Sequence, residues 1–209
     1  MKFALSPHRS AVLLLSATLG LSACAPIMVG AAVGTGMVAS DRRTSGAQLE
    51  DEAIELKSVN RIQENFGTRV RVNVTSYNRL VLLSGEVPSE ADRQRVQQVV
   101  AGVDNVRSVV NELAVLDSPG LSQRTADVVL TGKVKAGLID HKELSAQAFK
   151  VVTERGIVHL MGRVTRREAD LATEIARTTS GVKSVVRIFE YISEAELRQL
   201  QPAPAPAKP

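Results

Sequence analysis

Val81-Leu-Leu-Ser-Gly-Glu-Val87 and Val158-His-Leu-Met-Gly-Arg-Val164 are two copies of one pattern, V-x-L-x-G-x-V, in a chain of 209 residues. Apolar side chains alternate along it, and period-two alternation is typical of a strand with one buried face. A shorter alternating segment precedes each copy, at 70–74 and at 149–151. Each copy therefore predicts two consecutive strands. The glycine in the pattern predicts a bulge or the close approach of a helix backbone.

Turn and capping residues frame both copies in the same way. Asn78-Arg79 and Arg155-Gly156 separate the paired strands, where a hairpin turn is required. A capping box follows each motif, Ser89-x-x-Asp92 in the first copy and Thr165-x-x-Glu168 in the second. Such side chains satisfy the free N–H groups in the first turn of a helix. We therefore expect a helix directly after each hairpin.

Two more elements complete each copy. The helix after the hairpin ends at Gly102 or Gly181, and a third apolar strand follows. Leading helices are predicted over 49–66 and 125–139, and third strands over 106–115 and 185–192. A helical crossover allows strand three to lie parallel to strand two. The predicted fold class is α+β, with two tandem αββαβ modules, each a three-stranded mixed sheet packed against two helices. Modules this small bury modest cores, so we expect the two to pack against each other.

The first residues are typical of a bacterial lipoprotein signal. Lys2 and Arg9 flank the start of an apolar run over 11–21, which is too short to span a bilayer. The run ends in Leu21-Ser22-Ala23-Cys24, the pattern that a lipoprotein signal peptidase cuts before a lipidated Cys. Cys24 is the only Cys, so no disulfide framework is expected. The alternative is an ordinary secretory signal in which this Cys has no role.

The predicted organisation has six parts. A Gly/Ala/Val-rich tether and a Pro/Ala-rich tail flank the two modules and contribute no core. The boundaries are a signal segment 1–23, a lipidated tether 24–48, a first module 49–116, a linker 117–124, a second module 125–193 and a tail 194–209.

Charge and the scarcity of reactive residues exclude several classes of function. The formal net charge of +4 falls to +2 when Lys2 and Arg9 leave with the signal, which gives no argument for a nucleic-acid partner. His141 and His159, the two histidines of the mature chain, belong to no nucleophile–base or metal-ligand pattern. We therefore expect no catalysis, no cofactor, no metal and no small-molecule substrate.

The duplicated motif, followed in each copy by G-V-x-x-V at 102–106 and 181–185, resembles the BON (bacterial OsmY and nodulation) domain. Val151–Val164 is particularly close to that family, and the resemblance covers nearly the whole mature chain up to Ile192. It implies an outer-membrane lipoprotein facing the periplasm. In enterobacterial lipoproteins, an Asp directly after the lipidated Cys resembles an inner-membrane retention signal, and here that position holds Ala25. The resemblance further implies that the second BON domain binds anionic phospholipid chiefly through its first helix. A role in envelope integrity and enrichment at the division site are also implied.

The two leading helices differ in charge. The first carries five acidic and two basic residues between positions 50 and 64. The second carries Lys133 and Lys135, with Arg124 nearby, against Asp127 alone. A Lys or Arg beside an anionic lipid surface contributes about 1 kcal/mol, so only the second helix suits such a surface.

The apolar pattern of this second leading helix is too wide for one core-facing stripe. Val128, Val129 and Leu130 are consecutive, and at 3.6 residues per turn they sweep more than half the circumference. Either some of them face outward, as in an interfacial helix, or the extra ones pack against the first module. The chain has no Trp to anchor at the headgroup level. The candidate lipid-contacting residues are Val128, Val129, Leu130, Lys133, Val134, Lys135, Leu138 and Ile139.

A second class of function also fits the pattern. The acidic helix over 49–66 and an exposed sheet face would suit a periplasmic adaptor that binds an envelope protein partner without specific lipid binding. Crosslinking to one stoichiometric protein, with no lipid preference, would favour this alternative.

Overall fold

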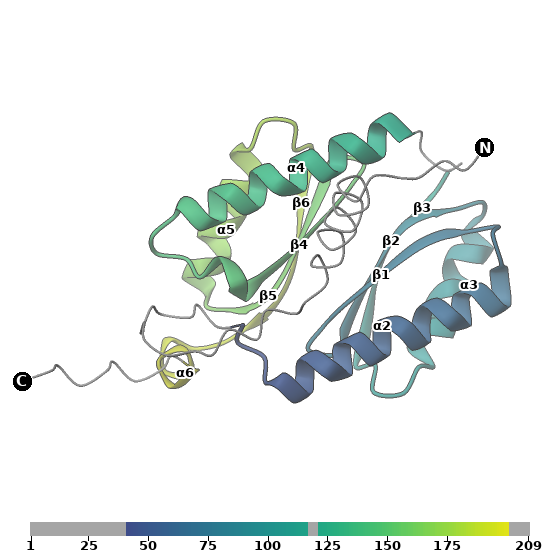
Figure 1. Cartoon of the computed structure of the whole chain (residues 1–209), viewed down its shortest axis with the longest axis horizontal. Helices are drawn as coiled ribbons and strands as arrows, with labels where there is room; N and C mark the ends of the chain where they lie inside the picture. Colours follow the sequence, from purple (N-terminus) through teal and green to yellow (C-terminus); the bar gives the residue numbers. More distant parts are fainter. Residues whose placement is uncertain (1–40, 117–120, 201–209) are drawn as a thin grey trace, which may run out of the picture. The chain divides into compact units, whose positions relative to one another are not determined.

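The computed structural model describes residues 41–116 and 121–200. Two rounds of helix, strand, strand, helix, strand follow one another along the chain, which confirms the predicted α+β class and its duplication (Figure 1). The first round consists of α2 (Ser45–Phe66), β1 (Arg71–Tyr77), β2 (Leu80–Val87), α3 (Glu90–Ala101) and β3 (Ser108–Val115). The second consists of α4 (Leu121–Asp140), β4 (Phe149–Glu154), β5 (Ile157–Val164), α5 (Arg166–Thr178) and β6 (Ser184–Tyr191), with a 3₁₀ turn at Ala146–Ala148 before β4.

Each module has one three-stranded mixed sheet. The orders are β1-β2-β3 and β4-β5-β6, and in both the hairpin pair is antiparallel while the pair joined by the crossover helix is parallel. The capping boxes begin the crossover helices as predicted, with Ser89 accepting from the Asp92 N–H and Thr165 from the Glu168 N–H. Both helices of a module cover the same face of its sheet (Figure 1).

The glycine of the strand motif allows a close approach, although not to one of the long helices. A Cβ on Gly85 would lie 2.1 Å from the backbone oxygen of Arg71, where β1 begins. A Cβ on Gly162 would lie 2.4 Å from the backbone oxygen of Ala148, in the 3₁₀ turn before β4. In each copy, backbone of the segment that begins the preceding strand therefore lies directly against the glycine.

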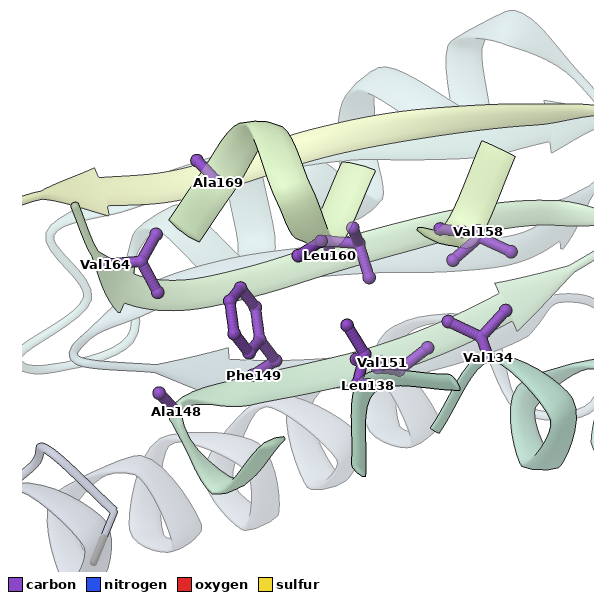
Figure 2. Packing of buried hydrophobic residues seen from close by; sticks show 11 residues of the cluster. Val134, Leu138, Ala148, Phe149, Val151, Val158, Leu160, Val164 and Ala169 are labelled. Carbon is purple, nitrogen blue, oxygen red and sulfur yellow. The ribbon is translucent and has the colours of Figure 1, made fainter. Parts of the chain in front are cut away.

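The core of each module lies between its helices and its sheet. In the second module, Val134 and Leu138 of α4 pack with Val151 of β4 and Leu160 of β5 (Figure 2). The first module repeats this arrangement, and its fully or nearly fully buried members are Ile54, Ile62, Phe66, Val81, Leu83, Val87, Val96, Val100 and Leu113. The first V, the L and the last V of the motif thus lie on the face of the sheet that the helices cover, as the alternation predicts.

The other faces of the two sheets meet in a third cluster, as expected for modules with small cores. Tyr77 and Leu82 of the first module pack with Met161 and Ile188 of the second. Charged groups add further links between the modules, namely Arg71 to Glu154, Arg155 to Glu86 and Lys150 to Glu55.

Regular secondary structure begins earlier than predicted and ends later. The tether was expected to end at residue 48, but α2 begins at Ser45, where the Thr44 side chain accepts from the Ala47 N–H. Just before it, Arg42 forms an ion pair with Glu168 of the second module. The expected tail begins instead with a short helix, α6 (Glu194–Leu200), which buries Leu197.

Candidate functional site

A buried aspartate attaches the leading helix α4 to the hairpin of its own sheet. The Asp127 carboxylate accepts hydrogen bonds from the backbone N–H groups of Arg155 and Gly156, both at 2.8 Å. These two residues form the β4–β5 turn with positive φ angles of 54° and 78°. Because the carboxylate satisfies both turn amides, it fixes the height of α4 over the sheet.

The first module contains the same device. Asp51 of α2 accepts from the N–H groups of Asn78 and Arg79, and also from the Ser76 hydroxyl. Burial alone would raise the pKa of Asp51, but these hydrogen bonds, with that from Arg43, hold its pKa below the ordinary value. The sequence analysis missed both aspartates. An Asp at matching places in the two leading helices was the available signal.

The core-facing side of α4 holds three of the predicted lipid-contacting residues. Leu130 is 6% exposed, Val134 is fully buried and Leu138 is 1% exposed. Val134 and Leu138 belong to the core between α4 and the sheet. Burial argues against direct membrane contact by Val134 and Leu138, whereas Leu130 lines the groove described below. A sequence run without a known core direction does not separate the inner face of a helix from its outer face.

The outward side of α4 carries the other five. Val128, Val129 and Ile139 are 73%, 54% and 69% exposed. At about 100° per residue, Val128 and Ile139 lie on one side with the exposed small residues Gly132 and Ala136 between them. The extra apolar residues therefore do not pack against the first module. They form an outer ridge, defined here as Val128, Val129, Gly132, Ala136 and Ile139.

Exposed cations flank the outer ridge on both sides. Lys133 lies beyond Val129, whereas Lys135 and Arg124 lie beyond Val128 on the opposite flank. Among the residues described, the lysines that form ion pairs are Lys57 and Lys150. The positive charges beside the ridge are therefore not neutralised by acidic side chains of the described chain.

The leading helix of the first module also exposes apolar residues, which the sequence analysis did not predict. Leu49, Leu56 and Val59 of α2 are 68%, 64% and 47% exposed. Glu52 is exposed one turn from both Leu49 and Leu56, and Lys57, which is also exposed, pairs with Asp104. The apolar face of α2 therefore lies among charges of both signs, whereas that of α4 is flanked by cations.

An open groove of about 340 Å³ borders the outer ridge. Its walls come from three elements: α4, the β4–β5 turn and the loop between α5 and β6. Val129 and Lys133 line one wall, and Gly156, Gly181 and Lys183 line the others. The Lys183 side chain lies against Gly156, since a Cβ there would be 3.2 Å from its aliphatic carbons. Sequence reasoning had no means to find this groove, because its walls are distant along the chain.

The described structure buries one of the two histidines that the sequence analysis considered. His159 is buried where the sheets meet, its Nδ1 lies 3.3 Å from the Val152 oxygen, and burial lowers the pKa of its imidazole. Among the described residues, no group of three His, Cys, Asp or Glu side chains is placed to hold a metal ion. Within the same residues, no helix combines the length and apolarity needed to cross a bilayer.

Comparison with known proteins matches the model of the BON domain twice, at residues 50–117 and 126–192. The chain belongs to the BON domain family. It therefore contains BON domain 1, built around α2 and α3, and BON domain 2, built around α4 and α5.

Curated proteins are similar to the chain over most of its length. The outer membrane lipoprotein DolP of Haemophilus influenzae is 36% identical over 190 residues, covering 90% of this chain and 98% of that protein. A 21 kDa hemolysin of Actinobacillus pleuropneumoniae is 31% identical, covering 73% of this chain and 79% of that protein. The osmotically-inducible protein Y of Escherichia coli is 31% identical, covering 71% and 76%. The chain is thus a DolP-like dual-BON protein, and none of these three names is that of an enzyme. The expected lipidation site, Cys24, lies outside the described residues.

Proposed function

We propose that BON domain 2 binds anionic phospholipid through the outer ridge of α4 and the cations beside it. The observation that supports this most directly is the exposure of Val128, Val129 and Ile139 between lysines that have no acidic partner in the described chain. An amphipathic surface of this kind inserts apolar side chains at the level of the headgroups, while its cations remain with the lipid phosphates.

The charges are sufficient for binding that depends on lipid composition. Arg124, Lys133 and Lys135 would contribute about 1 kcal/mol each beside an anionic leaflet. Transfer of the exposed parts of the three apolar side chains adds roughly 1 kcal/mol each. Screening shortens the electrostatic part to about 8 Å at physiological ionic strength, so binding weakens as salt rises.

The proposal also assigns this activity to the bacterial envelope. We propose that Cys24 carries the acyl anchor, that the protein is held in the outer membrane facing the periplasm, and that it acts by binding without catalysis. Support comes from the signal pattern before Cys24 and from the 36% identity to the outer membrane lipoprotein DolP. A contribution to envelope integrity, with enrichment at the division site, belongs to the same proposal.

Vesicle cosedimentation tests the lipid-binding activity. The unlipidated mature chain (residues 24–209 with Cys24→Ser) is mixed with phosphatidylcholine vesicles that contain either no phosphatidylglycerol or a large fraction of it, at low and moderate salt. We expect binding to the anionic vesicles alone, weakened by salt, and lost in Lys133→Glu/Lys135→Glu. Equal binding to both vesicle types, or unchanged binding of the double variant, would refute the assignment to α4.

The outer face of α2 favours a second candidate function. Leu49 and Leu56 are exposed beside Glu52, and the nearby Lys57 is paired with Asp104, so this surface offers an anionic membrane less attraction than α4 does. This face fits an envelope protein with a basic, partly apolar surface. If crosslinking from position 59 in cells gives a single stoichiometric protein product, and Leu56→Ser removes it, BON domain 1 acts as an adaptor.

A further inference from the structure

The groove beside α4 has a counterpart position in BON domain 1, where the charges differ. Lys57 follows Asp51 by six residues, and Lys133 follows Asp127 by the same number. Asp104 is the second residue after Gly102, and Lys183 is the second after Gly181. In domain 1 this pair is Lys57 and Asp104, which form an ion pair at 3.6 Å. In domain 2 the same two positions hold Lys133 and Lys183.

The space between these positions is also occupied differently. In domain 1 the hairpin turn supplies Arg79, whose Nε donates to the Asn105 backbone oxygen at 2.7 Å. The corresponding turn residue in domain 2 is Gly156, which has no side chain. The groove there remains open, with a volume of about 340 Å³ that lies in the range of small-molecule sites.

The carboxylate in this groove does not neutralise the two lysines. Asp127 lines the groove, but its Oδ1 accepts from the Gly156 N–H and from Gln123, and its Oδ2 accepts from the Arg155 N–H. Neither Lys133 nor Lys183 forms an ion pair with any residue that the structure describes. Two ammonium groups on one groove favour an anion between them, because like charges repel and an intervening anion attracts both.

We infer that the groove lined by Lys133 and Lys183 binds the phosphate of an anionic phospholipid headgroup. Val129 lines the same groove and is 54% exposed, so the acyl region of the lipid would lie against the outer ridge. This inference rests on the proposed lipid binding and adds to it a defined site, with one wall supplied by the loop between α5 and β6. A peripheral helix that only adsorbs to charge would need no such groove.

The variant Lys183→Asp tests this site, and we expect it to fold because the corresponding positions of domain 1 hold the pair Lys57 and Asp104. The matched control is Arg95→Asp, which makes the same change of charge at an exposed position of α3 in domain 1. We expect Lys183→Asp to weaken binding of the unlipidated mature chain to phosphatidylglycerol-containing vesicles at least tenfold, and Arg95→Asp to weaken it less than twofold. Equal losses in the two variants, or no loss in either, would overturn the inference.

The outcomes separate failure of the site from failure of the function. If the wild-type chain does not bind anionic vesicles, lipid binding itself is wrong. If it binds, and Lys133→Glu/Lys135→Glu reduces binding while Lys183→Asp does not, the outer ridge is correct and the groove is wrong.

A second readout identifies the occupant. The amide signals of Gly156 and Gly181 are followed by ¹⁵N NMR during titration with dihexanoyl phosphatidylglycerol or inorganic phosphate. We expect the lipid to shift both signals at a much lower concentration than phosphate, and Lys183→Asp to abolish the shifts. Saturation by phosphate at the same concentration as the lipid would indicate a free-anion site and overturn the assignment to a headgroup.

Discussion

The charge cluster between the two modules gives the sharpest stability prediction. Glu86 is 1% exposed and forms ion pairs with Arg71 at 2.5 Å and with Arg155 at 2.9 Å. Arg71 also contacts Glu154, so the cluster contains two acids and two bases from both modules. Glu86→Gln removes the charge that the two guanidinium groups share while retaining the size of the side chain.

The expected magnitude follows from the burial of the partners. Removing one partner of a fully buried ion pair costs about 3–5 kcal/mol. Here the side chains of Arg71 and Arg155 are 23% and 21% exposed, and Arg71 keeps Glu154. We therefore expect Glu86→Gln to lower the free energy of unfolding by about 2–3 kcal/mol, a figure below the fully buried range because water screens part of the charge. In a chain of this size that corresponds to a decrease in Tm of about 4–12 °C.

Urea unfolding at pH 7, followed by tyrosine fluorescence, measures this loss. Tyr77 lies in the cluster between the sheets, so its emission reports on the contact between the modules. Glu174→Gln is the control, because Glu174 pairs with Arg177 on the exposed face of α5 and should cost less than about 0.5 kcal/mol. A loss for Glu86→Gln as small as the control would show that the cluster is screened by water and does not hold the modules together.

Three further outcomes follow from single side chains. The pKa of the Asp51 carboxyl lies below its ordinary value of 3.8. The stability that it contributes is therefore complete above about pH 4 and is lost as the pH falls through the lowered pKa. In acid unfolding, the stability of Asp51→Asn should depend less on pH in this range than that of the wild type. Gly162→Ala should lower stability by about 1–3 kcal/mol in thermal unfolding, because the new Cβ meets backbone, whereas Gly132→Ala, which meets nothing within 4 Å, should raise it by about 0.5–1 kcal/mol. Val128→Ser, at an exposed position, should reduce vesicle binding without changing Tm. Val134→Ala, at a buried position, should lower Tm through the loss of core contacts. A lower Tm in Val128→Ser would mean that the outer ridge packs against another part of the protein.

The repeat made the fold predictable because local signals agreed with one another. Period-two apolar positions, a turn and a capping box occurred in the same order twice, and each is decided by residues close in sequence. The start of α2 was missed because Gly46 in its first turn is a poor helix former. Its position depends on Thr44 as cap and on Arg43, which pairs with Asp51 a full two turns later.

The sequence could predict which helix carries the candidate site, but not which of its residues are exposed. Its excess of apolar residues and its basic charge were visible in the sequence, but the division into buried Leu130 and exposed Val128 depends on where the sheet lies. The groove required more than that. Lys133 and Lys183 are separated by fifty residues, and only the crossover from α5 to β6 brings the second lysine beside the first.

The shared aspartate explains how two copies of one module can carry different outer faces. Asp51 and Asp127 fix their leading helices from beneath, through the amides of the hairpin turn. The outward residues are thereby free of any structural task, and substitution there changes the surface without moving the helix. In BON domain 1 the exposed pair Lys57 and Asp104 neutralise each other. In BON domain 2 the corresponding positions hold Lys133 and Lys183, both positive, so under the proposed function we expect an anionic surface to attract that domain more strongly than its neighbour.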